Sequence, residues 1–142
     1  MLSNNINDLN YFKSLGWTNS QIRNQLSKKI NYGLGLYEKK ILKAFILGNL
    51  IFIENILEYE ILLIYVDSSK RRLGYASKLL RKISLNLKKN NLKKIYLEVA
   101  DNNLEAIKLY KKNGYKKNGV RKNYYNFNDK KINASLLVKL YD

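Results

Sequence analysis

The spacing of apolar residues changes along the chain, and these changes predict where helices and strands lie. From Gly74 onward, apolar residues recur three and four positions apart, as they do along one face of a helix. They are Ala76, Leu79, Leu80, Ile83 and Leu87. The next stretch, KKIYLEVA, has the period of two that a strand has, since Ile95, Leu97 and Val99 alternate with Tyr96 and Glu98. We therefore predict a helix that begins near Gly74 and, after it, a strand.

The first part of the chain has weaker patterns. A short helix is predicted over Asn7–Leu15, and a second one follows Trp17, where Thr18 and Gln21 have the spacing of a capping box. The apolar stretches KKILKAFILG and LIFIENILEYEILLIYV then predict sheet that is covered on both faces. The second stretch fits either two strands joined near Glu54–Glu58 or one long bent strand.

The last part of the chain contains a helix and two strands. DNNLEAIKLYKKNG predicts a helix with Asn102 or Asn103 as its N-cap and Asn113-Gly114 as its end. YKKNGVRKNYYNF and INASLLVKLY predict a terminal pair of strands. The order of strands and helices predicts a mixed sheet flanked by helices. With no repeat or low-complexity linker, residues 1–142 are expected to form a single domain.

The amino-acid composition excludes several kinds of catalytic and metal-binding chemistry. The chain has no cysteine and no histidine, which excludes disulfides, thiol nucleophiles, imidazole catalysis and zinc sites, so no metal is expected. Acid–base chemistry must therefore come from carboxylates, tyrosines, lysines or the backbone. No apolar run approaches the roughly 20 residues of a membrane span. The first residues, MLSNNINDLNYF, do not resemble a signal peptide, so a cytoplasmic protein without membrane contact is expected.

The charge is strongly positive. The chain carries 27 Lys and Arg against 11 Asp and Glu, a net charge of +16. Such a balance is typical of nucleic-acid-binding proteins, but here the charge is spread along the chain instead of gathered in one stripe. We therefore favour a generally basic, solvated surface, and no direct nucleic-acid function is required.

The junction between Val66 and Ser77 is a candidate anion site. A strand ends at LLIYV, a polar loop follows, and a helix begins near Gly74. Unpaired backbone N–H groups and the helix dipole at such a start attract phosphates, and Arg71 and Arg72 add charge. Neither the Walker pattern nor Gly-x-Gly-x-x-Gly is present. From these residues alone, a phosphate site and a plain basic helix start that happens to contain a glycine are equally good interpretations.

Arg71-Arg72-Leu73-Gly74-Tyr75-Ala76 resembles the Arg/Gln-x-x-Gly-x-Gly/Ala acetyl-CoA loop of the GNAT N-acetyltransferase superfamily. Further motifs follow in the order found in the bacterial ribosomal-protein-alanine N-acetyltransferases. They are Leu97-Glu98-Val99, Asn103, the stretch from Ala106 to Tyr115, and the stretch from Arg121 to Tyr125. The resemblance extends from about Leu63 to the C-terminus. It implies the α/β (α+β) GNAT fold, with a mixed, mostly antiparallel central sheet flanked by helices.

The resemblance also implies roles for individual residues. Glu98 matches the proton acceptor and Tyr110 the proton donor, although alone they would be taken as an exposed strand residue and a core aromatic. The backbone of three strand residues would contact the pantetheine arm of acetyl-CoA, namely Ile64, Tyr65 and Val66. The loop and helix start would hold the pyrophosphate, namely Arg71, Arg72, Leu73, Gly74, Tyr75, Ala76 and Ser77. Asn103 would bind the co-substrate farther along, unless it is only an N-cap.

The acceptor implied by the resemblance is the N-terminal alanine of a small-subunit ribosomal protein. Two alternatives stay open: a GNAT enzyme that acetylates another amine (an internal lysine, a polyamine or a small molecule), and a non-catalytic basic module that binds RNA or the ribosome. The tyrosines interleaved with lysines, as in KNYYNF, are the basis of the second alternative. Only 16 residues precede Trp17, too few for both the first strand and the first helix of the fold, which puts the N-terminal strand in question.

Overall fold

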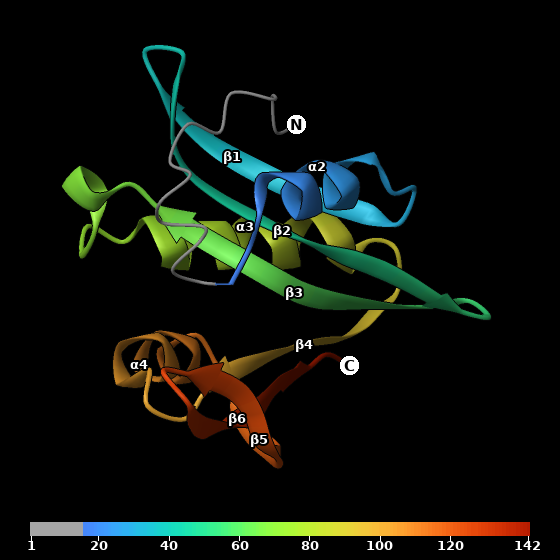
Figure 1. Cartoon of the computed structure of the whole chain (residues 1–142). Helices are drawn as coiled ribbons and strands as arrows, with labels where there is room; N and C mark the ends of the chain where they lie inside the picture. Colours follow the sequence, from blue (N-terminus) through green and yellow to red (C-terminus); the bar gives the residue numbers. More distant parts are fainter. Residues whose placement is uncertain (1–15) are drawn as a thin grey trace.

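The computed structural model describes residues 16–142, so the helix predicted over Asn7–Leu15 lies outside the described residues. Figure 1 shows the elements in chain order. The helices are α2 (Asn19–Ser27), α3 (Tyr75–Lys88) and α4 (Leu104–Lys112), with a 3-10 turn at Ser68–Lys70. The strands are β1 (Asn31–Glu38), β2 (Ile41–Ile53), β3 (Ile56–Val66), β4 (Leu92–Ala100), β5 (Lys116–Phe127) and β6 (Lys130–Leu140). Within residues 16–142, no helix is long and apolar enough to cross a membrane.

The strands form one mixed sheet in the order β1-β2-β3-β4-β6-β5, in which only β3 and β4 pair in parallel. The predicted mixed, mostly antiparallel sheet is therefore confirmed. Strand β1 was not predicted, because Gly33 and Gly35 interrupt the apolar pattern of its sequence NYGLGLYE and glycine disfavours strands. The segment that would contain a strand before α2 lies outside the described residues.

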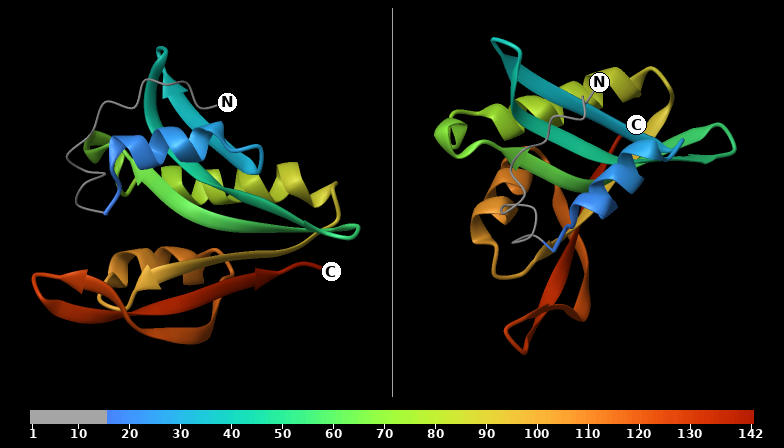
Figure 2. Two further views of the ribbon diagram at one scale, coloured as in Figure 1. Left: turned by 45° about the vertical axis from the view of Figure 1, so that its right-hand side comes forward. Right: turned by 45° about the horizontal axis from the view of Figure 1, so that its top comes forward.

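Helices cover both faces of the sheet, so the molecule has two apolar cores. Helices α3 and α4 pack on one face, where Leu79, Ile83 and Tyr110 join side chains of β2, β3 and β4. Helix α2 packs on the other face, where Ile22 meets Phe45 and Leu47. Figure 2 shows α2 and α3 on opposite sides of the strands between them. The capping box of α2 is confirmed, since the Gln21 amide N–H donates to Thr18 Oγ1 at 3.2 Å and the Thr18 amide N–H to Gln21 Oε1 at 2.8 Å.

Strand β3 changes the face that its side chains cover. The long apolar stretch forms two strands, β2 and β3, joined by a turn at Glu54–Asn55. Leu47 pairs with Leu63 but Gly48 pairs with Ile61, so Leu62 is an extra residue, a β-bulge. Before the bulge Leu57, Tyr59 and Ile61 lie in the α3–α4 core, and after it Leu63 and Tyr65 lie in the α2 core.

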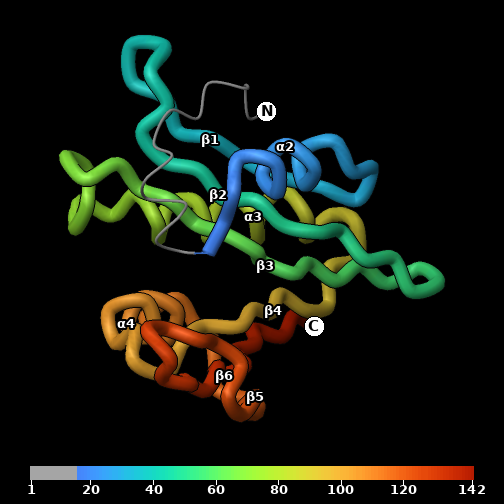
Figure 3. The backbone as a smooth tube through the Cα atoms, in the orientation of Figure 1, coloured from blue at the N-terminus to red at the C-terminus, as the bar shows by residue number. Residues whose placement is uncertain are grey.

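The parallel strands β3 and β4 are paired for only part of their length. Their pairing runs from Leu57 and Leu92 to Glu60 and Tyr96. Beyond that point β3 continues to Val66 and β4 to Ala100, but no pair joins them. Figure 3 shows the two strands diverging toward the side where α4 lies. This divergence opens the sheet in its centre and positions the candidate site.

Candidate active site

A cleft of about 750 Å³ lies where β3 and β4 diverge. Its walls come from β3, the loop before α3, the first turn of α3, β4, α4 and β5. The cleft brings together eleven of the thirteen residues predicted from the sequence, namely Ile64, Val66, Arg71, Arg72, Gly74, Tyr75, Ala76, Ser77, Glu98, Asn103 and Tyr110. Tyr65 and Leu73 do not line it. The Tyr65 ring is buried in the α2 core, 5.4 Å from the ring centre of Phe45, and the Leu73 side chain is exposed to solvent.

The wall formed by β3 has a backbone edge that β4 does not cover. Between Ile61 and Val66 the strand is paired with β2 on one side only. Such an edge offers N–H and C=O groups to an extended ligand, in the manner of an added strand. The predicted contribution of Tyr65 is a backbone contact, so its buried side chain is compatible with it. At the end of this edge, Arg71 Nε donates to the Val66 carbonyl at 3.0 Å.

Helix α3 begins at the cleft without a capping side chain. Its N-cap is Gly74, whose φ of +85° is left-handed, a conformation that a residue with a Cβ adopts only at a cost. Apart from Gly74 itself and its two neighbours in the chain, no protein atom lies within 4 Å of the position that a Cβ would occupy, so the backbone there faces open space. The first N–H groups of a helix have no acceptor within the helix and carry the positive end of its dipole. Tyr75, Ala76 and Ser77 bring this helix end to the cleft.

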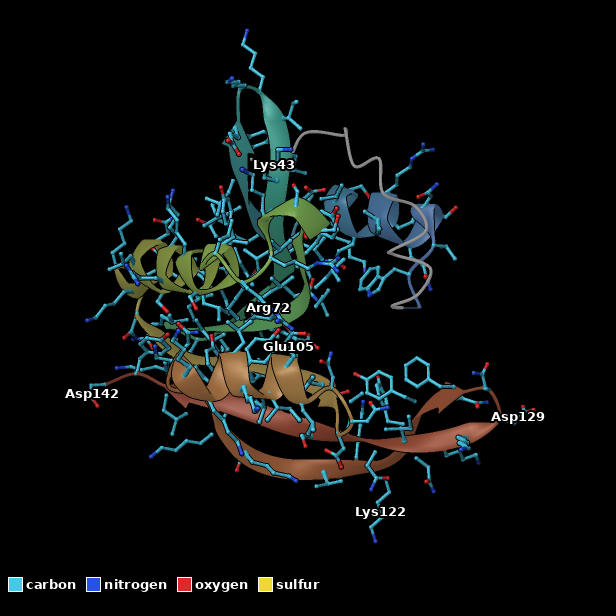
Figure 4. All side chains as sticks on the ribbon, turned by 90° about the vertical axis from the view of Figure 1, so that its left-hand side faces the viewer. Lys43, Arg72, Glu105, Lys122, Asp129 and Asp142 are labelled. Atoms are coloured by element: carbon cyan, nitrogen blue, oxygen red, sulfur yellow. The ribbon has the colours of Figure 1, made fainter. Side chains whose placement is uncertain are left out.

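An exposed ion pair crosses the cleft near that helix end. Arg72 Nε lies 3.5 Å from Glu105 Oε1, and the side chains are 86% and 76% exposed. Figure 4 shows Arg72, from the loop before α3, and Glu105, on α4, pointing toward each other. Both residues line the cleft. Glu105 was not singled out from the sequence, because nothing in the sequence places the start of α4 opposite that loop.

Asn103 has the two features that the sequence left as alternatives. It is the N-cap of α4, where its Oδ1 accepts a hydrogen bond from the Ala106 amide N–H at 3.2 Å. It also lines the cleft. The structure therefore places Asn103 as an N-cap at the wall of the site.

Glu98 lies on the face of β4 that looks toward α2, opposite the buried Leu97 and Val99, as the alternation predicts. Its Oε1 and Oε2 lie 3.0 and 3.2 Å from Nη1 of Arg121 on β5. The Arg121 guanidinium also lies 4.8 Å from the ring centre of Tyr124. Burial, followed by the charge of Glu98, raises the pKa of Tyr125 to about 12, so this phenol keeps its proton at neutral pH.

Tyr110 reaches the cleft from the other side. It lies on α4, is buried in the α3–α4 core, and its ring centre is 5.6 Å from that of Tyr115. Glu98 and Tyr110 therefore line the same cleft from opposite faces of the sheet. A carboxylate can accept a proton and a tyrosine can donate one, so a group bound between them has a proton acceptor on one side and a proton donor on the other.

Several residues in or next to the cleft were not predicted as site residues. Arg121, which contacts Glu98 but does not line the cleft, was quoted within a motif and given no role, and its contact depends on the order β4-β6-β5. Four aromatic residues also line the cleft, namely Trp17, Tyr124, Tyr125 and Phe127. Glu60, at the end of the β3–β4 pairing, also lines the cleft.

Solved structures resemble this fold closely. The ribosomal-protein-S18-alanine N-acetyltransferase of Escherichia coli is 24% identical, with a TM-score of 0.76 over 86% of this chain and 76% of that one. Naa50 of Arabidopsis thaliana, solved with the bisubstrate analogue CoA-Ac-MVNAL, is 29% identical, with a TM-score of 0.69 over 77% of this chain and 72% of that one. NAA60 of Arabidopsis thaliana, solved with acetyl-CoA, is 16% identical, with a TM-score of 0.76 over 96% of this chain and 94% of that one.

A search of curated proteins finds no significant match to the sequence. The model of the acetyltransferase (GNAT) family, however, matches residues 34–115, which is more than half of the chain. This range runs from within β1 to just past α4, and it therefore contains the divergence of β3 and β4, the start of α3, Glu98 and Tyr110. We conclude that the chain belongs to the acetyltransferase (GNAT) family, whose members are N-acetyltransferases that use acetyl-CoA.

Proposed function

We propose that this enzyme acetylates protein N-termini in the cytoplasm, and that its acceptor is the N-terminal alanine of a small-subunit ribosomal protein. The observation that carries the proposal is the position of Glu98 and Tyr110 on opposite walls of one cleft, beside the open helix start at Gly74. The order of motifs from Leu97 to Tyr125 supports the choice of acceptor. So does the similarity to the E. coli enzyme, which is named for ribosomal protein S18.

The proposed binding of acetyl-CoA uses groups on the α3–α4 side of the cleft. The β3 edge at Ile64, Tyr65 and Val66 offers backbone groups to the pantetheine arm, and Asn103 lies farther along the wall. The loop and helix start from Arg71 to Ser77 offer a positive helix end, two guanidinium groups and an open position at Gly74 to the pyrophosphate. The thioester supplies the acetyl group.

The proposed transfer requires two protons to leave the acceptor nitrogen and one proton to reach the thiolate. Glu98 takes a proton from the acceptor ammonium, directly or through a water molecule. The freed amine nitrogen then attacks the thioester carbonyl carbon and forms the amide bond while the carbon–sulfur bond breaks. Tyr110 gives its proton to the departing thiolate and is reprotonated through water by the second proton that the nitrogen loses, so that the products are the acetylated N-terminus and CoA.

A carboxylate base can deprotonate the α-ammonium group of a peptide more easily than the ammonium group of a lysine side chain. Ordinary pKa values are about 8 for an α-amino group and about 10.4 for lysine, so deprotonating the α-ammonium is easier by about 3 kcal/mol. The aromatic side chains that line the cleft, among them Tyr124, Tyr125 and Phe127, offer an apolar surface to the first residues of a peptide. These features favour a peptide N-terminus over an internal lysine or a polyamine.

A peptide panel tests the proposal. The peptides share one sequence and begin with Ala, Ser, Gly or Met, and a further peptide has a blocked N-terminus and one internal lysine. We expect CoA release to be fastest with the Ala peptide and negligible with the blocked one. Acetyl-CoA alone should raise the melting temperature. Transfer only to the lysine peptide or to a polyamine would overturn the choice of acceptor, and no stabilisation by acetyl-CoA would argue for the non-catalytic alternative.

A further inference from the structure

The positive charge of the protein is unevenly distributed. Residues 71–142 carry 19 Lys and Arg against 5 Asp and Glu, a net charge of +14, whereas the first 70 residues carry 8 against 6. Within this second half, α3 and its C-cap contain five cationic residues and no acidic one, namely Lys78, Arg81, Lys82, Lys88 and Lys89. We propose that these five residues, here called the α3 surface, bind RNA through its phosphate backbone.

The five cations lie on the outer side of α3. The helix runs along the strands of the sheet (Figure 2), and its apolar side is buried against them through Leu79, Leu80, Ile83 and Leu87. Lys78, Lys82 and Lys89 are four and seven residues apart, and Arg81 and Lys88 are also seven apart, so they form two neighbouring rows. All five residues are exposed. From Lys78 to Lys89 the α3 surface is about 16 Å long, at 1.5 Å per residue.

No acidic group neutralises the α3 surface. The four ion pairs found within residues 16–142 use other cations, namely Lys70, Arg72, Lys94 and Arg121. Lys78 and Lys82 are one helical turn apart, a spacing at which like charges destabilise a helix. The fold gains nothing from this arrangement, whereas a row of phosphates would neutralise it and release its own counterions.

A hollow of about 230 Å³ extends the α3 surface toward the end of β6. Arg81 and Lys88 line it together with Lys139, whose Nζ lies 5.6 Å from the ring centre of Tyr141. The hydroxyl groups of Tyr141 and Ser84 also lie there, hydrogen-bonded to each other, and no acidic residue of the described chain lines the hollow. Three cations can bind a phosphate, and the ring and hydroxyl groups beside them suit a ribose or a base.

The extent of the charge indicates a polymer. The three cations of the hollow would be enough for one small anion, but Lys78, Lys82 and Lys89 continue the charge along the helix beyond it. Leu85 is the one large apolar side chain that α3 exposes, which is too little to insert the helix into a lipid surface. These features favour a nucleic acid over a single metabolite or a membrane.

The way in which α3 packs favours RNA over DNA. Because the apolar side of the helix is buried along its length, α3 presents its flank and does not project into the deep major groove of B-DNA. The minor groove of A-form RNA is wide and shallow, and it exposes 2′-hydroxyl groups beside the phosphates. The hydroxyl groups of Ser84 and Tyr141 can hydrogen-bond to these 2′-hydroxyls.

The test compares two variants that lose the same net charge from different places. The α3 variant combines four changes, namely Arg81→Gln, Lys82→Gln, Lys88→Gln and Lys89→Gln. The control variant changes four exposed lysines that follow α2 or lie in the β1–β2 turn, namely Lys28→Gln, Lys29→Gln, Lys39→Gln and Lys40→Gln. The probe is a fluorescent RNA hairpin with a stem of about 16 base pairs, a length that a typical double-stranded RNA-binding domain spans. Fluorescence anisotropy measures binding at several salt concentrations.

We expect the α3 variant to bind this RNA about 10²- to 10³-fold more weakly than the wild type at about 0.1 M salt. Its plot of log affinity against log salt concentration should be shallower by about three units, as the loss of four phosphate contacts predicts. Lys139→Gln alone should lower the slope by about one unit. The control variant should bind within about threefold of the wild type, since screening limits the effect of distant charges.

An equal loss of affinity in the control variant would overturn the inference, because net charge and not the α3 surface would then explain binding. So would equal affinity for a DNA hairpin of the same sequence, or tighter binding to vesicles of phosphatidylserine and phosphatidylcholine. None of the four residues changed in the α3 variant lines the cleft, so its kcat and its KM for acetyl-CoA should match the wild type. RNA binding is measured without acceptor or acetyl-CoA, so this inference and the proposed function can fail independently.

Discussion

The paired and the diverging parts of β3 and β4 have different tasks, although they belong to the same two strands. In the paired part Leu57, Tyr59 and Ile95 are fully buried and join the helices to the sheet. In the diverging part Ile64 and Glu98 line a cleft. The change lies at the bulge at Leu62, which turns the side chains of β3 and separates its paired, buried part from the part that lines the cleft. Substitutions in one part should therefore affect folding, and those in the other part catalysis.

Glu98→Gln should have the largest effect, in the diverging part. Replacing the proposed base by an amide of the same shape should lower kcat by about 10²- to 10⁴-fold, the usual contribution of general base catalysis. The melting temperature should change little, because the pair with Arg121 is half-exposed. Initial rates with acetyl-CoA and the Ala peptide measure the loss. An undiminished rate would remove Glu98 from its role.

Leu57→Ala should show the opposite behaviour, in the paired part. Leu57 is 0% exposed in the α3–α4 core, so its truncation should reduce the free energy of unfolding by about 2–5 kcal/mol. Urea unfolding measures this loss. Molecules that stay folded should keep their activity. Ile64→Ala, a partly buried position at the cleft, is the matched control and should lose less than half as much stability. An equal loss of unfolding free energy in Leu57→Ala and Ile64→Ala would contradict the difference between the paired and the diverging parts.

Tyr110→Phe should lower kcat by about 10- to 100-fold, because only the proton given to the thiolate is lost and water can partly replace it. The ring stays in the α3–α4 core, so acetyl-CoA should stabilise the variant as it does the wild type. A thermal shift with acetyl-CoA is the control. Tyr115→Phe, which also removes a buried hydroxyl, should keep full activity, and a similar loss of kcat there would point to packing.

Gly74→Ala should cost about 1–2 kcal/mol of stability, since its φ of +85° is left-handed. It should also weaken acetyl-CoA binding, because the added methyl group fills the open space beside the backbone at the start of α3. Gly16→Ala is a matched control: Gly16 has φ +80° and open space around it, but does not line the cleft. Both variants should lose similar stability in urea, and only Gly74→Ala should lose affinity for acetyl-CoA in a titration.

Arg72→Ala should have the smallest effect. Its pair with Glu105 is exposed on both sides, so stability should change by no more than about 1 kcal/mol. If Arg72 binds the pyrophosphate, the KM for acetyl-CoA should rise about threefold to tenfold. This is the loss of affinity expected when one charged contact exposed to water is removed. Glu105→Gln frees Arg72 and should leave this KM unchanged or lower it. A rise in both variants would mean that the ion pair, and not Arg72 alone, supports binding.

Local signals were enough to predict much of the fold. Thr18 and Gln21 marked the start of α2, Gly74 the start of α3, and the alternation around Glu98 fixed which face of β4 its carboxylate lies on. Strand β1 was missed because Gly33 and Gly35 weaken its pattern. These signals act within a few residues, so they are visible without knowledge of the fold.

The cleft depends on contacts between distant segments, which local patterns do not contain. The bulge at Leu62 lies in a continuous apolar stretch, where one extra residue leaves no trace in the composition. The contact of Arg121 with Glu98 requires β6 to lie between β4 and β5. The pair of Arg72 with Glu105 requires α3 and α4 to begin on either side of the divergence. The assignment of catalytic and binding roles stays a prediction that rests on the resemblance.

The position of β6 also determines when the sheet can be completed during synthesis of the chain. β6 follows β5 along the chain yet lies between β4 and β5 in the sheet, and Leu140 pairs with Lys94. Until β6 has left the ribosome, β4 lacks its second neighbour, and no strand joins β4 to β5, which carries Arg121. A nascent chain therefore lacks the complete wall of the cleft near Glu98 until β6 is inserted between β4 and β5.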